Sequence, residues 1–282
     1  MSNILVIGSN GLLGRSLVKH FVLNGLQVGA LSRSRCENIE GFESYTVDVL
    51  NYKSLEPVVA LYDVIINCIG QITHPIYECI ALNTNGIGNI VRAVNKNKNH
   101  LIHLSTVSVY GSLLFATEES LVNPESVYGS LKYFAEYQVS SGLSNFTILR
   151  ISNLYGSEQK KGIVGYVLRT FYNKKKNLYF DNDGSLKRYY IHIDDVSSMV
   201  ELILKKNIKG TYNIGSDDFL TVKQLIDVCE RELDYSFDVV FEAKKPIENI
   251  DKIDDSKLKN KIHYIQKHNI ETYLNSVKDI ML

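Results

Sequence analysis

The pair Tyr128 and Lys132 is the feature of this sequence best suited to chemistry. Four residues separate the two side chains, so a helix would place both on one face, one turn apart. A phenol with a pKa of about 10 is a poor acid–base catalyst at neutral pH, but a nearby ammonium stabilises its phenolate. The pair therefore predicts proton exchange with a carbonyl oxygen. Both side chains are also predicted to contact a bound cofactor.

Thr106 supplies a third group of the right type. It follows the apolar run 101–105, within Ser-Thr-Val-Ser-Val-Tyr-Gly. A hydroxyl at this strand end can hold the same carbonyl oxygen, so Thr106 is predicted to be both catalytic and substrate-binding. A Tyr/Lys pair alone usually lies on a helix surface without function. The prediction depends on its combination with Thr106 and with the glycine turn described next.

A glycine-rich turn at 8–14 predicts the site of a dinucleotide. It joins an apolar run to a helical stretch, where glycine allows close approach of a pyrophosphate and the helix start favours its charge. The spacing is G-x-x-G-x-x-G, and Arg15-Ser16 replaces the Lys-Ser/Thr of a P-loop. The predicted contacts from the turn are Gly8, Asn10, Gly11, Leu12, Leu13 and Gly14.

The end of the second apolar run bears on which dinucleotide binds. An NAD-specific enzyme usually places a carboxylate there, against the ribose 2′-hydroxyl, whereas this sequence has Ser32, Arg33, Ser34 and Arg35. A guanidinium can hold a 2′-phosphate through paired charge-assisted hydrogen bonds. We therefore predict a preference for NADP(H), with Arg33 as the contact and NAD(H) as the alternative. The alternative in which these residues bind no cofactor is a solvated basic loop.

Alternating elements must position these residues. Apolar runs at 4–8, 28–32, 45–49, 64–69, 101–105 and 147–151 alternate with amphipathic stretches at 12–24, 80–95 and 128–140. Runs too apolar for half-exposed strands predict a parallel sheet covered by helices on both faces. The fold class is therefore α/β, a Rossmann-type doubly wound sheet.

The second half of the chain is less regular. We predict a dinucleotide-binding domain at 1–155, its sheet completed by segments near 189–215, and a smaller substrate-binding part at 156–282 that forms a C-terminal α/β lid. No repeat or Pro/Gly-rich linker separates the two parts.

Bulk composition narrows the functional classes. The 31 basic and 31 acidic residues balance, so no global charge attracts nucleic acid or a membrane surface. The four cysteines show no C-x-x-C spacing, so neither a disulfide framework nor a metal site is predicted. The N-terminus has no basic leader and no apolar run reaches spanning length, so a cytoplasmic location is expected.

Together the glycine turn, the Ser-Thr-x-x-Val-Tyr-Gly segment and the Tyr-x-x-x-Lys pair resemble the extended short-chain dehydrogenase/reductases. The closest likeness is to their NAD-dependent epimerase/dehydratase branch, which acts on nucleotide-linked sugars, and it extends over nearly the whole chain. The resemblance implies cofactor contacts at Asp48, Val49, Cys68, Ile69, Gly70 and Asn83, and substrate contacts at Asn153 and Arg188. It also implies a homodimer through the helix carrying Tyr128 and the helix before it.

Basic residues between 156 and 190 independently favour an anionic ligand such as a diphosphate. Lysines outnumber acidic residues there, but a run such as 174–176 usually ends a solvated helix, so only Arg188 is predicted as a contact. The adjacent His192 and Asp195 are interpreted as structural. His74 and Gln71 are equally consistent with a role at the substrate and with none.

Departures from the family pattern indicate the reaction. Sugar-nucleotide 4,6-dehydratases place Asp-Glu after the catalytic Thr, whereas this chain has Val107-Ser108. Epimerases generally have a longer C-terminal half and an acidic end to the second strand. The leading hypothesis is therefore NADPH-dependent reduction of a 4-keto-6-deoxy sugar nucleotide, with NAD-dependent 4-epimerisation second. A non-catalytic NAD(P)-sensing regulator is the alternative of another class.

Overall fold

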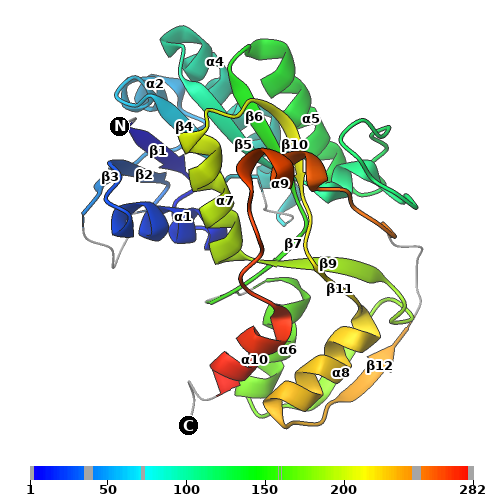
Figure 1. Ribbon diagram of the computed structural model, residues 1–282. Coiled ribbons are helices and arrows are strands. Elements are labelled where there is room, and N and C mark those ends of the chain that lie inside the picture. Colours follow the sequence, from blue (N-terminus) through cyan, green and yellow to red (C-terminus); the bar gives the residue numbers. More distant parts are fainter. Residues whose placement is uncertain are drawn as a thin grey trace.

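Seven parallel strands form the central sheet (Figure 1). The computed structural model describes residues 3–34, 41–70, 74–157, 159, 161–242 and 249–278. The strands follow the order β3-β2-β1-β4-β5-β6-β10, which is the doubly wound pattern that the alternating sequence predicts. Their bounds are Ile4–Ile7 (β1), Val28–Ser32 (β2), Glu43–Thr46 (β3), Val64–Asn67 (β4), His100–Thr106 (β5), Phe146–Ile151 (β6) and Gly210–Ile214 (β10).

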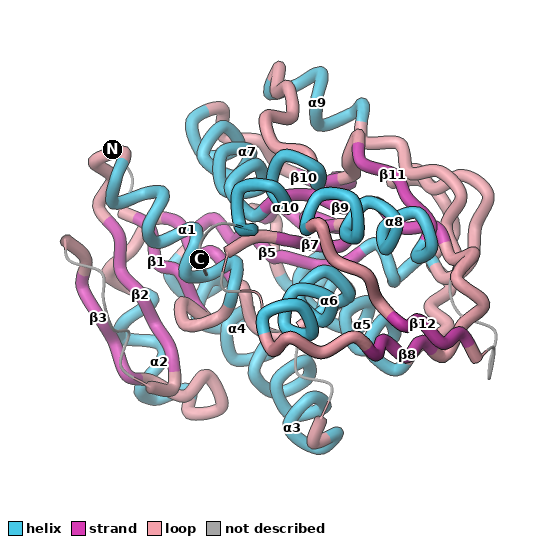
Figure 2. The backbone as a smooth tube through the Cα atoms, turned by 90° about the horizontal axis from the view of Figure 1, so that it is seen from below, coloured by secondary structure: helices cyan, strands magenta, loops and turns pink. Residues whose placement is uncertain are grey.

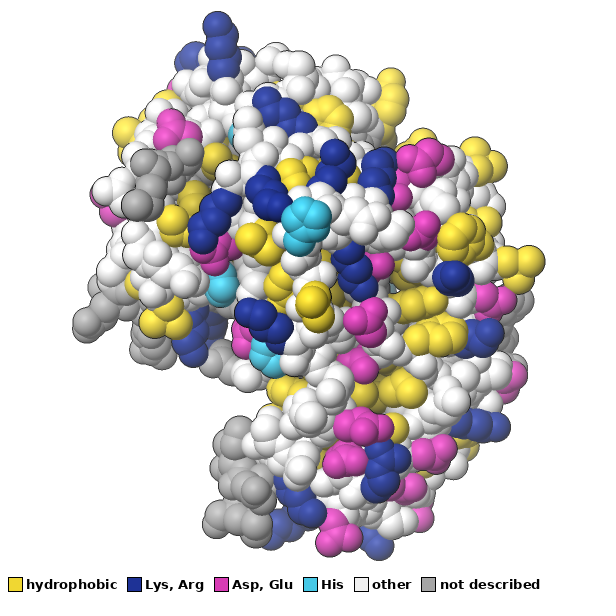
Figure 3. Space-filling view, in the orientation of Figure 1, with side chains coloured by type: hydrophobic (Ala, Val, Ile, Leu, Met, Phe, Trp, Pro, Cys, Tyr) yellow, Lys and Arg dark blue, Asp and Glu magenta, His cyan; other side chains and the backbone are white. Residues whose placement is uncertain are grey.

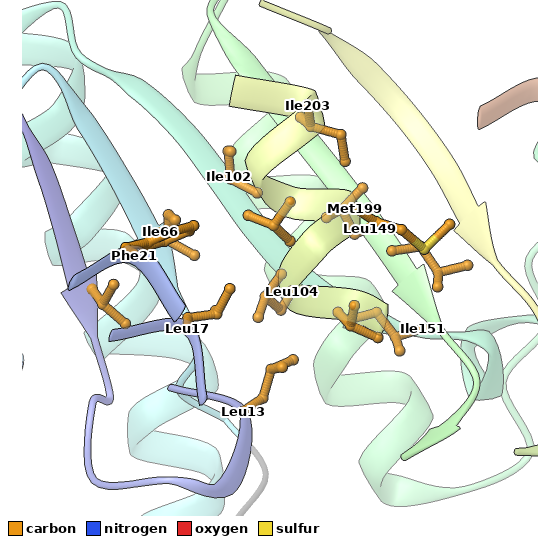
Figure 4. Packing of buried hydrophobic residues seen from close by; sticks show 14 of the residues in the cluster. Leu13, Leu17, Phe21, Ile66, Ile102, Leu104, Leu149, Ile151, Met199 and Ile203 are labelled. Carbon is orange, nitrogen blue, oxygen red and sulfur yellow. The ribbon is translucent and has the colours of Figure 1, made fainter. Parts of the chain in front are cut away.

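Helices cover both faces of this sheet, as Figure 2 shows. One layer contains α1 (Leu12–Leu23), α7 (Ile193–Lys205) and α9 (Ser256–Ile262); the other contains α2 (Tyr52–Val59), α4 (Ile87–Asn97) and α5 (Val127–Gly142). Strand side chains alternate between the layers. In Figure 4, Ile66, Ile102 and Leu104 pack toward α1 and α7, whereas Ile65 and Leu101 belong to the opposite core. The Rossmann-type fold prediction is therefore confirmed.

Short helical segments lie between strands β4 and β5 and the helices that follow them. A helix, α3 (Ile76–Ala81), runs through the π-helical turn η1 (Leu82–Gly86) into α4, and the 3₁₀ turn η2 (Val107–Tyr110) follows β5 directly. In the described part of the chain, no helix combines the length and apolar character needed to cross a bilayer.

A smaller part lies beside the carboxyl ends of the main sheet. It contains a three-stranded sheet of β7 (Asn153–Tyr155), β9 (Lys187–His192) and β11 (Asp218–Thr221), and a parallel pair of β8 (Asn177–Phe180) and β12 (Asp238–Phe241). The helices α6 (Gly162–Tyr172), α8 (Val222–Leu233) and α10 (Ile270–Lys278) enclose its own apolar core. Of the segments near 189–215, β10 forms an edge of the main sheet, whereas β9 pairs with β7 and β11 instead.

The C-terminal segment returns from the smaller part to the main one. Residues 249–254 run beside the loop after η2, pairing Leu113 with Ile250 and Ala116 with Ile253. Farther on, the buried Asp195 carboxylate accepts hydrogen bonds from the Tyr264 hydroxyl at 2.6 Å and from two backbone N–H groups, those of residues 267 and 268. Asp195 thus anchors the returning chain. Figure 3 shows the molecular outline hollowed where the two parts meet, and basic side chains gathered over α7 and α9.

Candidate active site

A cleft of about 1210 Å³ separates the main sheet from the smaller part. Its wall is built from the glycine turn, the ends of β4 and β5, the start of α5, the strands β7 and β9, and the segment at 250–253. Ligands of doubly wound sheets bind outside the carboxyl ends of the strands, which is where this cleft lies.

The glycine turn forms one end of the cleft, and all six of its predicted contacts line the wall. Gly8 has φ +85°, which other residues rarely adopt. A Cβ on Gly14 would lie 2.3 Å from the carbonyl oxygen of Gly8, so a side chain there would displace the turn. Gly11 precedes α1 without a side-chain cap, which leaves the helix start facing the cleft. This cradle fits the pyrophosphate of a dinucleotide.

The end of β2 lies beside the turn. Asn10 joins the two, because its Nδ2 donates hydrogen bonds to the Ser34 carbonyl at 3.0 Å and to the Ser34 hydroxyl at 2.9 Å. Arg33 lines the cleft with an exposed guanidinium that lies 3.5 Å from the Glu78 carboxylate, a surface pair of small energetic weight. Arg35 and Gln71 lie outside the described residues.

The other predicted cofactor residues divide into two groups. Val49, Cys68, Ile69 and Gly70 line the cleft. Asp48 does not, because its carboxylate turns back to accept the N–H of Leu50 at 2.9 Å.

Asn83 also lies behind the wall rather than in it. It is fully buried and donates to the carbonyls of Gly70 at 3.2 Å and Cys79 at 2.9 Å. A Cβ on Gly70 would lie 2.4 Å from the Oδ1 of Asn83. Asn83 therefore holds the turn after β4 in shape, and the structure does not bring it or Asp48 to the cleft surface.

The three predicted catalytic residues, Thr106, Tyr128 and Lys132, all line the wall of the cleft. Thr106 ends β5, and its hydroxyl accepts the N–H of Ser108 at 3.2 Å. Tyr128 lies in the first turn of α5. The start of α5 can lie close to η2 because Gly129 packs on the Ser108 carbonyl. A Cβ at position 129 would lie only 2.6 Å from that oxygen.

Lys132 reaches between the ends of two strands. It is 2% exposed, and its Nζ donates to the Leu104 carbonyl at 2.6 Å and to the Ile69 carbonyl at 3.5 Å. Burial lowers the pKa of Lys132 to about 8, against the opposing effect of the nearby Glu136. The ammonium is thus fixed between the turn after β4 and the strand that carries Thr106.

The two substrate contacts implied by resemblance lie on the strands of the smaller part. Asn153 donates to the carbonyl of Tyr189 at 3.3 Å, and the half-buried Arg188 donates to the carbonyl of Lys187 at 2.8 Å. Both line the cleft. Direct contact with substrate or cofactor stays a prediction for all of the residues described above.

An apolar wall beside Thr106 is not predicted by the sequence pattern. Ile250 and Ile253 line the cleft and pack in one cluster with Val107. The Tyr189 hydroxyl fixes their segment by donating to the Asp251 carbonyl at 3.2 Å and accepting the N–H of Ile253 at 3.3 Å. Nothing in the local sequence around 250–253 signals that it returns to this site.

His192, Asp194 and His268 form a cluster whose potential ligand atoms lie within 4.8 Å of one another. The two imidazole rings stack with centroids 4.4 Å apart and an interplanar angle of 23°. His192 Nδ1 accepts the N–H of Asp194 at 3.2 Å and so caps α7. Stacked rings do not aim their lone pairs at one point, so the geometry fits helix capping and packing better than metal binding.

Fold and site together define the class. A parallel sheet with a glycine turn at its first βα junction, and a Tyr/Lys helix that meets a strand-end threonine, are shared by the short-chain dehydrogenase/reductases. Residues 4–215 match the model of the NAD dependent epimerase/dehydratase family. The chain belongs to this family.

Individual relatives differ in what they do. The chain is 26% identical over 257 residues to dTDP-D-glucose 4,6-dehydratase of Dictyostelium discoideum. This match covers 77% of this chain and 59% of the dehydratase. It is also 26% identical over 237 residues to methionine adenosyltransferase 2 subunit beta of Bos taurus, covering 77% and 68%. The chain thus spans about three fifths of the dehydratase.

Among solved structures, the chain superimposes on UDP-glucuronic acid 4-epimerase of Bacillus cereus in complex with UDP-glucuronic acid and NAD. The TM-score is 0.89 at 23% identity, covering 99% of this chain and 98% of the epimerase. At this level of identity the likeness shows the fold.

Proposed function

We propose that the chain is an NAD(P)-dependent oxidoreductase that reduces a 4-keto-6-deoxy sugar carried on a nucleotide diphosphate. The observation that carries the proposal is that Thr106, Tyr128 and Lys132 line the same cleft as the glycine cradle. A Tyr/Lys pair without function is expected on the helix surface. Lys132 is instead 2% exposed, and its ammonium lies between two strand ends.

Each of the three groups has a distinct task in the reduction. The Thr106 hydroxyl donates a hydrogen bond to the ketone oxygen and orients the carbonyl. The Tyr128 hydroxyl gives its proton to the same oxygen, and the Lys132 ammonium stabilises the phenolate that remains. A bound nicotinamide supplies the hydride chemistry.

The charge of the cleft supports an anionic substrate and cofactor. Among the described lining residues, basic side chains outnumber acidic ones by seven to one, the acid being Asp194. Such a wall favours phosphate groups through charge-assisted hydrogen bonds. The basic residues are Arg15, Lys19, Arg33, Lys132, Lys161, Lys187 and Arg188.

The apolar wall supports the 6-deoxy sugar. Val107, Ile250 and Ile253 form one apolar cluster and line the same cleft as Thr106. An apolar wall accepts a methyl group but leaves a hydroxymethyl or carboxylate without partners. The same Val107 stands where a dehydratase would have an acid, which disfavours dehydration.

NAD-dependent 4-epimerisation is the second candidate. It uses the same three catalytic groups, and the fold matches that of a UDP-sugar 4-epimerase closely. The two reactions differ in redox balance, since reduction consumes its cofactor and epimerisation restores it.

That difference gives a direct experiment. Purified protein incubated with a 4-keto-6-deoxy sugar nucleotide and NADPH is expected to oxidise one NADPH for each sugar reduced, measured by cofactor absorbance and product NMR. An epimerase would instead interconvert two hydroxyl sugars without added NADPH and would retain tightly bound oxidised cofactor. Observation of that pattern would replace the reductase assignment.

The preference for NADPH is part of the proposal and depends on Arg33. We expect Arg33→Ala to raise the KM for NADPH by about 10- to 100-fold, which is the effect of losing hydrogen bonds to a charged group. The KM for NADH should stay nearly unchanged. Steady-state kinetics with each cofactor measure the effect. Lys53→Ala, a change outside the cleft lining, is the control. Equal use of both cofactors by the unmodified protein would exclude the preference.

We also propose a homodimer through α4 and α5. Phe134 and Tyr137 are three residues apart on α5, and both are exposed. Aromatic side chains exposed on one helix face are typical of association surfaces.

The non-catalytic alternative has some support from the bovine relative, whose name describes it as a subunit of a transferase. A regulator would bind NAD(P) without turnover. The retained Thr106, Tyr128 and Lys132 favour the enzyme, because a sensor has no use for a proton donor.

A further inference from the structure

A buried polar network lies beneath the catalytic wall, on the side of the sheet that α5 covers. Glu136 is 3% exposed and accepts a hydrogen bond from the Ser105 hydroxyl at 2.5 Å. Arg150 donates to the same carboxylate through Nη2 at 2.7 Å and Nε at 3.2 Å. It also donates to the Tyr110 hydroxyl at 3.0 Å, which in turn donates to Asn213 at 2.7 Å. The network therefore ties α5 to β5, β6 and β10.

Glu136 occupies a particular place in this network. It follows Lys132 by one helical turn, on the same face of α5. Its partner Ser105 directly precedes Thr106 in β5. The carboxylate thus bonds to the neighbour of one catalytic residue and lies one turn from another.

The buried ion pair of Glu136 and Arg150 is not explained by stability alone. Taking a carboxylate and a guanidinium out of water costs several kcal/mol, and apolar residues of similar volume often stabilise a core as well or better. The hydrogen bonds of Glu136 offset this cost but do not explain why charge is placed there.

The charge has a function at Lys132. Burial disfavours the ammonium, while the negative charge of Glu136 is the largest influence that favours it, ahead of Cys68 and Cys79. A neutral amine would give Tyr128 no electrostatic support. The carboxylate therefore acts where burial alone would remove the group that the chemistry needs.

We propose that Glu136 is a positioning residue of the catalytic site, which fixes the strand end that carries Thr106 and supplies the buried negative charge that complements Lys132. This inference rests on the proposed function, because proton transfer by Tyr128 is what requires both effects. Ser105 and Arg150 act through the same carboxylate, one as its link to β5 and the other as its counterion.

The titration of Lys132 tests the electrostatic part. Protein carrying ¹³C-labelled lysine is titrated without cofactor or substrate, and the Cε signal of Lys132 is assigned by its loss in Lys132→Arg. A negative charge favours the ammonium, so Glu136→Gln should move the midpoint to lower pH by about one unit or more. An unchanged midpoint in the folded variant would overturn the proposal.

Two further variants separate charge from structure. Glu56→Gln removes the carboxylate of a partly exposed pair with Lys96 on another helix and should leave the Lys132 midpoint unchanged. Glu136→Asp keeps the charge but withdraws it from Ser105. It should hold the midpoint close to that of the unmodified protein, slow hydride transfer by about tenfold and leave the Kd of the cofactor unaltered.

The Asp variant also decides the matter if Glu136→Gln does not fold. An unaltered rate, or a midpoint shifted to lower pH despite the retained charge, would count against a positioning role. Because the titration needs no turnover, it gives its answer even where no substrate is found. Failure of the proposed function and failure of this inference are thus distinguishable.

Discussion

Tyr128→Phe is expected to lower kcat by about 10²- to 10⁴-fold, the range that a positioned general acid contributes. The substitution removes one oxygen from the cleft wall and leaves the glycine cradle, Thr106 and Lys132 in place. The Kd for NADPH should therefore change by less than about twofold, since the phenol is only one of many predicted cofactor contacts and the others stay in place. Single-turnover kinetics and calorimetric titration with cofactor measure the two quantities separately.

Tyr133→Phe is the matched control for this experiment. It makes the same chemical change on the same helix, but at an exposed position outside the cleft lining. It should retain full activity. A Tyr128→Phe protein that turns over at the normal rate would remove the phenol from the mechanism.

Gly14→Ala should weaken cofactor binding by about 100-fold. The new Cβ would lie 2.3 Å from the carbonyl oxygen of Gly8, a backbone atom that cannot rotate away. The turn must therefore move, and a displacement of about 1 Å is enough for a loss of this size. Isothermal titration calorimetry with NADPH and NADH gives the affinities.

Gly88→Ala provides the comparison. It is also a glycine within a helix, but the nearest atom to its added Cβ is the flexible end of Gln138 at 3.1 Å. Its cofactor affinity should equal that of the unmodified protein, and alanine should favour the helix. Unchanged affinity in Gly14→Ala would show that the dinucleotide does not use this turn.

Local sequence patterns predicted much of the main part because the relevant signals are local there. The helix expected at 128–140 is observed as α5 at Val127–Gly142, begun by the cap of Ser126 on Gly129 at 3.1 Å. The amphipathic stretch at 12–24 is observed as α1 at Leu12–Leu23. Glycine spacing and apolar runs carry such information without reference to the rest of the chain.

Tertiary relationships were harder to predict. Ile250 and Ile253 join Val107 only because the chain crosses back from the smaller part, which no spacing rule records. The contact of Glu136 with Ser105 and Arg150 likewise joins a helix and two strands. Asp48 and Asn83 fit a family pattern by sequence, but their hydrogen bonds direct them to neighbouring backbone instead of the cleft surface.

Transfer of a label from cofactor to sugar tests the central claim most directly. NADPH carrying deuterium at the transferable position is offered with a panel of UDP, GDP, dTDP and CDP 4-keto-6-deoxy sugars, and the products are examined by NMR. We predict deuterium on the sugar carbon that bears the new hydroxyl, and its appearance about 10²- to 10⁴-fold more slowly with Tyr128→Phe. Deuterium that stays in the cofactor across the whole panel, in protein that binds NADPH tightly, would contradict the reductase account.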